Sequence, residues 1–353
     1  MASPLNAGPN DVFRKMIADI LDGPGPLPDK VPVSPQITAT APPVATPARA
    51  PAAPAEAVDA REKPRLPLEE FIPLAPLTCE QSGLSVNEIE SLALKYLLNC
   101  GPPAGREIAE HLRLPFRLLE VAFRRLKDQL LVVYKSSAAL SDYIYEPTVL
   151  GLDRARRLSE HLSYFGAAPV SLADYVASVA AQSVSRQRPR LSQLRKAFSD
   201  LVLGEEILRQ IGQALNGGMG LFLSGSPGNG KTCIAERIVR TFGEAIWIPR
   251  TLSVFGEVIR LYDPSNHEPL PLKDLGETAE AQIDKRWIRI RRPTLVVGGE
   301  LTLEHLEIRT NVAPGVGEAP LQMKANGGSL VIDDFGRQRV SARELLNRWI
   351  VPL

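Results

Sequence analysis

The residues with the clearest chemical meaning form a glycine-rich loop that ends in a lysine and a threonine. The loop comprises Gly225, Ser226, Pro227, Gly228, Asn229, Gly230, Lys231 and Thr232. Glycines let a backbone turn tightly enough for successive N–H groups to face phosphate oxygens, and a following helix adds the positive end of its dipole. In this pattern Lys231 reaches the β- and γ-phosphates and the hydroxyl of Thr232 binds Mg²⁺. The loop therefore predicts a site for ATP with Mg²⁺.

The surroundings of the loop favour this interpretation over a glycine-rich structural turn. An apolar run over residues 219–224 precedes the loop, and an amphipathic helix is expected to follow it. Cys233 comes directly after Thr232, so we count it among the nucleotide-binding residues. We expect its side chain to be a small buried group of the helix and not a catalytic thiol.

A second motif consists of an apolar strand that ends in two aspartates, Asp333 and Asp334. Ligands of open α/β sheets bind at the carboxyl ends of the strands, where these side chains would lie. Asp333 is expected to hold Mg²⁺ through water beside Thr232, and Asp334 to polarise the attacking water. The predicted catalytic residues are thus Asp334 and Lys231. The alternative is a solvated strand end without a ligand.

The C-terminal part of the chain, residues 192–353, has an α/β pattern. Helices are expected over 193–216 (with a loop near Gly204), 231–242 and 341–351, and strands over 219–224, 244–249 and 328–334. A long insertion over about 263–320 contains period-two runs that predict strands at 287–291 and 301–308, with a turn at Gly298–Gly299.

The combination of the two motifs resembles the AAA+ family of ATPases. Residues 198–204 look like the segment that leads into the phosphate-loop strand of that family, and residues 325–334 like the entry to its metal-binding strand. The resemblance covers residues 192–353. It implies an α/β P-loop NTPase fold and ATP hydrolysis by a ring-shaped homo-oligomer, usually a hexamer, that remodels a protein or nucleic acid.

The sequence departs from the family pattern in three ways. Asp334 stands where the family usually has glutamate, so hydrolysis is expected to be slow or the water placed differently. The insertion lengthens the separation of Thr232 and Asp333, and it is expected to contact substrate or a neighbouring subunit, the alternative being a decorative flap. The sequence ends at Leu353, before the family's later strands, arginine finger and helical lid. We therefore expect a fragment with a gap in the sheet between Phe222 and Ile332 and inefficient hydrolysis.

The region over residues 78–170 predicts a small α+β domain. Helices are expected over 86–98, 105–112 and 115–130, followed by a hairpin of 131–134 and 143–145 and a helix over 152–162. This order resembles a winged helix-turn-helix domain, which implies contact with DNA or with protein. The basic residues that could read DNA are Arg117, Arg124, Arg125, Lys127 and Lys135. Glu120 and Asp128 lie among them, so both partners stay open.

The remaining segments are expected to be tethers. Residues 1–23 predict a short amphipathic helix, either a docking helix for a protein partner or a frayed end. Residues 24–77 are rich in Pro and Ala and predict a disordered linker. A second, partly basic linker is expected over 171–191.

Bulk composition limits the location and partners. The net charge of +1 gives no global attraction to nucleic acid or to an anionic membrane. The three cysteines form no CxxC pair, no signal peptide is evident, and no apolar run is long enough to span a bilayer. We expect a cytoplasmic protein with no membrane partner. Its function would be that of an AAA+ remodelling ATPase, with an ATP-responsive DNA-binding regulator and a small-molecule kinase as alternatives.

Overall fold

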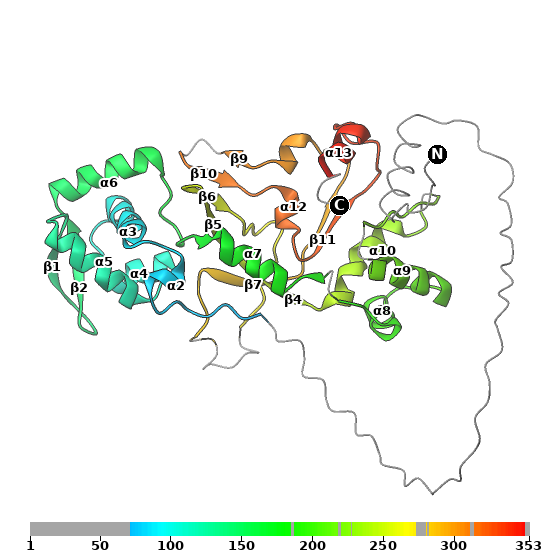
Figure 1. Ribbon diagram of the computed structural model, residues 1–353, viewed down its shortest axis with the longest axis horizontal. Coiled ribbons are helices and arrows are strands. Elements are labelled where there is room, and N and C mark those ends of the chain that lie inside the picture. Colours follow the sequence, from blue (N-terminus) through cyan, green and yellow to red (C-terminus); the bar gives the residue numbers. More distant parts are fainter. Residues whose placement is uncertain are drawn as a thin grey trace, which may run out of the picture. The chain divides into compact units, whose positions relative to one another are not determined.

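The computed structural model describes residues 71–349, apart from 185–186, 218–219, 227, 273–279, 281 and 311–313. The helix predicted over 1–23, most of the linker predicted over 24–77 and the end of the last predicted helix lie outside the described residues. Residues Leu68–Leu353 form one compact unit by their contacts. This unit is a mixed α/β structure (Figure 1). No described helix is both long enough and apolar enough to cross a membrane.

The N-terminal part of this unit contains a four-residue helix and then, in the predicted order, three longer helices, a β-hairpin and a further helix. Its elements are α2 (Cys79–Ser82), α3 (Val86–Cys100), α4 (Gly105–Leu112), α5 (Phe116–Asp128), β1 (Val132–Ala138), β2 (Asp142–Pro147) and α6 (Val149–His161). Ser85 and Glu88 form a capping box that starts α3. One face of α5 buries Leu119 and Phe123 against α3 and α4 because its apolar residues recur at helical spacing.

The core of this helical part extends beyond its predicted boundary at residue 170. Val258 and Val316, two sheet residues, belong to the same buried cluster as Ile89 and Phe123. The N–H of Ser163 donates to the carbonyl of Pro314 at 3.1 Å. Packing therefore joins the helices to the sheet that follows.

Residues 171–191 were expected to be a linker, but they contain a ten-residue helix. Strand β3 (Val170–Ser171) leads into α7 (Leu172–Ala181), and Ser171 caps that helix by accepting a hydrogen bond from the N–H of Asp174. Tyr175 of α7 is buried. The many small residues concealed a helix that is stabilised by its cap and by burial of its few large side chains.

The last residues of the predicted N-terminal linker are also part of the fold. Leu74 forms a β-bridge with Ile283, and the N–H of Ala75 donates to the carbonyl of Gln282 at 2.8 Å. The ring of Phe71 lies 5.5 Å from that of Trp287. The Pro/Ala-rich composition hid these contacts because they depend on a distant segment.

Strands β3 to β11 make up what we call the β-rich part of the unit. Its largest sheet is a five-stranded mixed sheet. Its strand order is β3-β5-β6-β10-β9, with β5 (Thr251–Val254), β6 (Glu257–Arg260), β10 (Val316–Glu318) and β9 (Arg309–Thr310). Strands β5 and β6 form a hairpin, and β10 adds to β6 in parallel.

Two strands predicted for the ATPase core pair with strands of the predicted insertion. Strand β4 (Ala245–Pro249) pairs with β7 (Trp287–Arg291) in antiparallel fashion. Strand β11 (Ser329–Ile332) pairs with β8 (Thr294–Val297) in parallel. The insertion is therefore a structural partner of both strands and not a separate flap.

One predicted strand of the insertion is wrong. Residues 301–308 contain the 3₁₀ helix η4 (Leu303–Leu306), which Thr302 and His305 cap reciprocally. Leu301 and Leu306 are both buried in one cluster with Leu345. Burying these two leucines together overrides the alternating pattern that suggested a strand. Helix α12 (Leu321–Lys324) lies between this segment and β11.

The region around the glycine-rich loop is mainly helical. Its elements are α8 (Leu191–Ala197), α9 (Glu205–Gly217), α10 (Lys231–Ile238), the 3₁₀ helix η2 (Val239–Phe242) and, further along, α13 (Ala342–Trp349). Helices α8, α9 and α10 lie side by side (Figure 1) and share an apolar cluster that includes Phe198 and Ile211. Ile234 and Ile238 of α10 pack against this cluster.

The buried strand predicted over 219–224 is wrong for the residues described there. Residues 220–224 join no sheet, and Leu221 and Phe222 are 37% and 65% exposed. A strand exists only with a partner that completes its hydrogen bonds, and β11 is paired with β8. The apolar character of residues 220–224 predicted a strand, but it carries no information about whether another strand is available to pair with it. Among the described residues, none does so.

Candidate phosphate-binding site

The glycine-rich loop has backbone angles that suit glycine. Gly228 and Gly230 have φ of 82° and 69°, in the left-handed region that side chains with a Cβ rarely adopt. No atom lies within 4 Å of a Cβ built on either residue, so backbone conformation and not crowding requires glycine there. The loop residues on both sides of Pro227 are exposed. The loop is thus a tight turn that opens to solvent.

Helix α10 begins directly at the end of the loop. Gly230 is its N-cap and supplies no side-chain cap, while the N–H of Ile234 donates to the carbonyl of Gly230. Among the described residues, none accepts a hydrogen bond from the N–H of Thr232 or Cys233. These free donors and the helix dipole make the start of α10 attractive to an anion.

The side chain of Lys231 folds back over the loop. Its Nζ donates to the carbonyl oxygens of Gly225 and Ser226 at 3.1 and 3.0 Å. The ammonium group is therefore held above the turn, beside the start of α10.

The two sequence motifs meet in a side-chain hydrogen bond. The hydroxyl of Thr232 donates to Oδ2 of Asp333 at 2.9 Å, across 101 residues of sequence. The N–H of Asp333 donates to the carbonyl of Val297 at 2.8 Å, which continues the ladder between β11 and β8. The predicted insertion thus fixes the carboxylate that contacts the loop's threonine.

Asp334 points elsewhere. Its φ is 50°, its side chain is 68% exposed, and Oδ2 lies 3.8 Å from Nη1 of Arg337. The buried side chain of Gln338 donates to the carbonyls of Asp333 and Asp334 at 2.7 and 3.0 Å. Gln338 therefore secures the turn after β11, a role that no sequence pattern signalled.

Cys233 differs from its expected environment. The sequence predicted a buried side chain, whereas Cys233 is exposed and unpaired with another cysteine. Helix α10 is only eight residues long and has no fully buried residue, so its second and third positions remain open to solvent.

Helix α10 is also anchored by ionic contacts. Arg237 Nε and Arg240 Nη1 lie 2.9 and 3.3 Å from Oδ2 of Asp200. The hydrogen bond from Arg237 lowers the pKa of Asp200 from its ordinary value. Asp200 belongs to the segment over 198–204 that resembles the lead into the phosphate loop, and it ties this segment to α10.

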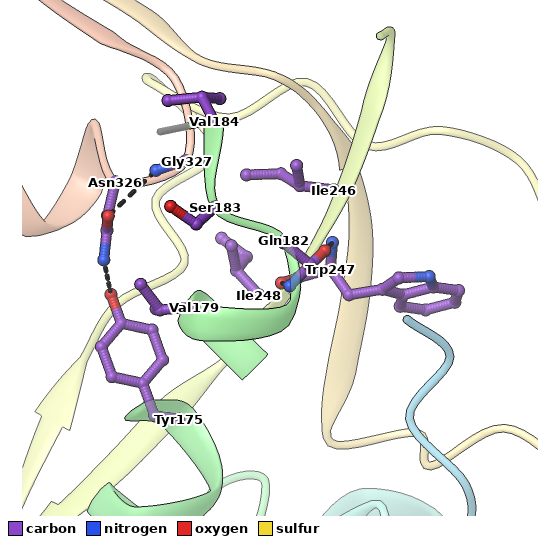
Figure 2. A pocket seen from close by; sticks show the side chains of 10 residues that line it. All are labelled: Tyr175, Val179, Gln182, Ser183, Val184, Ile246, Trp247, Ile248, Asn326 and Gly327. Atoms are coloured by element: carbon purple, nitrogen blue, oxygen red, sulfur yellow. Dashed lines mark hydrogen bonds between the residues drawn. The ribbon is translucent and has the colours of Figure 1, made fainter. Parts of the chain in front are cut away.

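A small cavity of about 70 Å³ lies near the start of β11 (Figure 2). Asn326 Nδ2 donates to the hydroxyl oxygen of Tyr175 at 2.9 Å, and the N–H of Gly327 donates to Asn326 Oδ1 at 3.0 Å. On its other side, the amide of Gln182 makes two hydrogen bonds to the backbone of Trp247. The cavity is too small for a nucleotide, and its polar groups serve to join α7 to β4 and to the loop before β11.

The five basic residues that were candidates for reading DNA are each engaged by another group. Their partners are the carbonyl of Pro76 for Arg117, Glu120 for Arg124, Glu90 for Arg125, the ring of Tyr134 for Lys127 and Glu146 for Lys135. Burial raises the pKa of Glu90, while Arg125 and Arg154 act in the opposite direction. The structure therefore presents no free row of cations on α5.

Comparison with protein-family models gives no match for this chain. No curated protein matches it significantly either. The functional interpretation therefore depends on the geometry of the site and on the motifs.

Proposed function

We propose that this protein binds ATP with Mg²⁺ at the loop over residues 225–232 and hydrolyses it. The observation that carries the proposal is the hydrogen bond between Thr232 and Asp333, which unites two motifs far apart in sequence. A phosphate-binding loop requires a lysine and a hydroxyl at its end and a carboxylate on a neighbouring strand. All three are present and adjacent.

The residues of the site fit a magnesium nucleotide. The hydroxyl of Thr232 and the carboxylate of Asp333 are hard oxygen ligands of the kind that Mg²⁺ prefers. Within the described residues, no group of three or more His, Cys, Asp or Glu side chains could hold a metal by itself. Bound Mg²⁺ would neutralise charge on the transferred phosphate, and it would take its remaining ligands from the nucleotide and water.

The chain's own residues would divide the remaining work. Lys231 binds the β- and γ-phosphates in place of the carbonyls it now contacts, and the free N–H groups at the start of α10 bind phosphate oxygens. Asp334 orients the attacking water and accepts its proton. Its exposed side chain must turn away from Arg337 to do so.

We further propose that hydrolysis occurs in an AAA+ type ring of identical chains that remodels a protein or nucleic-acid target. The motifs over residues 198–204 and 325–334 support this assignment. The extensive pairing of the insertion with β4 and β11 supports a role for it in linking the nucleotide site to the rest of the chain.

Nucleotide binding can be tested with a fluorescent ATP analogue and Mg²⁺. Lys231→Ala should weaken binding by about a hundredfold or more, because it removes the only lysine at the loop. Lys196→Ala, an exposed lysine of α8, is the matched control and should bind as the wild type does. Equal affinity of Lys231→Ala and the wild type would refute the proposed site.

The helical part over residues 78–170 is proposed to be a winged-helix domain that contacts a protein. The five candidate DNA-reading residues are engaged within the fold, whereas Leu130, Val133, Val149 and Leu150 are 44–76% exposed around the junction of the hairpin and α6. Exposed apolar side chains grouped in this way favour a protein partner over DNA.

The alternative function, an ATP-responsive DNA-binding regulator, makes a different prediction. It requires duplex binding that falls steeply with salt and is lost in Arg124→Ala/Arg125→Ala. We expect no such binding. Phosphate release that a protein target stimulates, and that Lys231→Ala abolishes, is the outcome expected of the remodelling ATPase.

A further inference from the structure

A second polar cavity lies at one face of the five-stranded sheet, and none of its lining residues belongs to the proposed nucleotide site. It is open and measures about 470 Å³. Its lining residues are Arg260, Tyr262, Asp263, Pro264, Arg309, Glu318 and Lys324.

The register of the sheet places three charged residues in one row. Glu318 of β10 is paired with Arg260 of β6 on one side and with Arg309 of β9 on the other. Directly paired residues of neighbouring strands project from the same face. One glutamate therefore stands between two arginines.

The row leaves hydrogen-bonding capacity unused. Arg260 Nη1 lies 3.8 Å from Glu318 Oε1, too far for a hydrogen bond. Within the described part of the chain, Arg309 has no ion-pair or hydrogen-bond partner, and neither carboxylate oxygen of Glu318 accepts a hydrogen bond. A ligand could satisfy both groups without displacing an existing bond.

One wall of the cavity is an ion pair between a buried lysine and a partly buried aspartate. Lys324 Nζ donates to Asp263 Oδ2 at 2.7 Å and lies 3.7 Å from Glu318 Oε2. His267 Nδ1 accepts from the N–H of Asp263, so Nε2 carries the proton and donates to the carbonyl of Lys324. Burial favours the protonated form of Asp263, but hydrogen bonds from Lys324, Ser265 and Asn266 outweigh it and lower the pKa of that carboxyl.

The ion pair of Lys324 and Asp263 is not explained by a gain in folding stability. Partial removal of these two charges from water costs free energy, and an apolar pair of similar volume is often as stable. Because Asp263 is already saturated with donors, it fixes Lys324 in place and leaves Glu318 and Arg309 as the groups that can still bind. This arrangement is that of a preformed polar site.

The charges define the ligand. Arg260, Arg309 and Lys324 carry three positive charges and Asp263 and Glu318 two negative ones, which leaves one positive charge. A ligand that matches must offer a carboxylate to the arginines, a cationic donor to Glu318 and one net negative charge. A free amino acid with an acidic side chain has these groups within a few bonds of one another.

We propose that this cavity binds an acidic α-amino acid, with a carboxylate on Arg309 and Arg260 and the ammonium group on Glu318. The planar guanidinium of Arg309 suits bidentate binding of a carboxylate. The proposal is independent of nucleotide binding at Lys231.

Calorimetric titration of the full chain at constant ionic strength tests this inference. L-Glutamate should bind saturably, with a dissociation constant on the order of 1 mM or below. Glutarate, which lacks the ammonium group, and inorganic phosphate should each bind at least about tenfold more weakly. Wild-type protein that binds either of them as well as L-glutamate, or that shows no saturable binding of L-glutamate up to about 10 mM, would overturn the proposal.

Variants identify the residues responsible. Arg309→Gln should weaken L-glutamate binding by about tenfold or more, and Glu318→Gln should remove the preference for L-glutamate over glutarate. Arg291→Gln, an exposed ion-paired arginine of β7, is the control and should bind normally. Should Arg309→Gln fail to fold, Arg309→Lys is the second variant. It keeps the charge but lacks the paired N–H donors of the guanidinium, so it must still weaken binding. Unchanged affinity in a folded Arg309 variant contradicts the assignment.

Discussion

At the scale of single residues, the two aspartates that follow β11 differ in their contacts and conformation. Asp333 is held by the hydroxyl of Thr232, whereas Asp334 adopts a left-handed conformation that aspartate and asparagine tolerate better than glutamate does. The conformation gives a physical reason for an aspartate where the AAA+ pattern has glutamate. The strained turn is stabilised by Gln338, whose amide binds both carbonyls.

Asp334→Asn separates binding from hydrolysis. Asparagine fits the same backbone angles and keeps the turn, so nucleotide affinity should stay within about twofold of the wild type. Hydrolysis should fall by about tenfold or more because the carboxamide cannot accept a proton. Phosphate release and nucleotide affinity are measured on the same preparation, with Arg337→Gln as the control. Turnover that survives in Asp334→Asn would exclude Asp334 as the base.

Lys95 gives a pH-dependent prediction. Its side chain is 1% exposed, Nζ donates to the carbonyl of Leu162 at 2.9 Å, and burial lowers its pKa from 10.5 to about 8. Below pH 8 the folded state therefore keeps a charged lysine at a cost in free energy. Between pH 8 and 10.5 the folded state releases its proton first, so this cost disappears and stability rises with pH.

Lys95→Met should therefore be more stable than the wild type at pH 7 and unfold at higher urea. The expected gain in the free energy of unfolding is about 1–2 kcal/mol, because the relief of the buried charge exceeds the loss of one hydrogen bond. The difference should shrink at pH 10. Lys196→Met, at an exposed position of α8, should show no such pH dependence. A variant that is less stable than the wild type at pH 7 would show that the ammonium group contributes net stability.

At the scale of elements, the side-chain amide of Gln182 makes the two hydrogen bonds to the backbone of β4 that a neighbouring strand would make. It donates to the carbonyl of Trp247 at 2.9 Å and accepts from its N–H at 2.7 Å. Gln182→Ala leaves these two backbone groups without partners and should lower the free energy of unfolding by about 1–3 kcal/mol. Gln213→Ala, an exposed position of α9, should be near neutral. Urea titrations that give equal stability for both variants would contradict this role.

Local patterns predicted the hairpin and most of the longer helices, but not α7 or the pairing of strands. Helices α3, α4 and α5 were predictable because the apolar residues of each segment recur at helical spacing. The partners of β4 and β11 lie in a distant insertion, and pairing across such a distance leaves no local signal. The closeness of Thr232 and Asp333 was expected from the two motifs, whereas the hydrogen bonds of Gln338 to the turn after β11 and of Gln182 to Trp247 were not, because a single amide contact follows no residue pattern.

At the scale of the whole unit, a buried ion pair joins segments that the sequence assigned to different domains. Arg286 binds Asp284 at 2.7 Å, with both side chains at most 4% exposed, and its Nη1 also donates to the carbonyls of Ser82 and Pro169. The helical part therefore shares its hydrogen bonds, as well as its core, with the β-rich part. We expect both parts to unfold together.

Arg286→Met tests this coupling because it leaves Asp284 buried without its counter-charge. Such a loss should cost about 3–5 kcal/mol. The three tryptophans, Trp247, Trp287 and Trp349, all lie after residue 170, so their fluorescence reports on unfolding beyond the helical part, while far-ultraviolet circular dichroism reports on the helices on both sides of residue 170. Both signals should shift to lower urea by the same amount.

Arg291→Met, which removes exposed ion pairs from the neighbouring strand β7, should leave both midpoints nearly unchanged. Two separate transitions in Arg286→Met would instead show that the helical part can unfold independently of the rest of the unit.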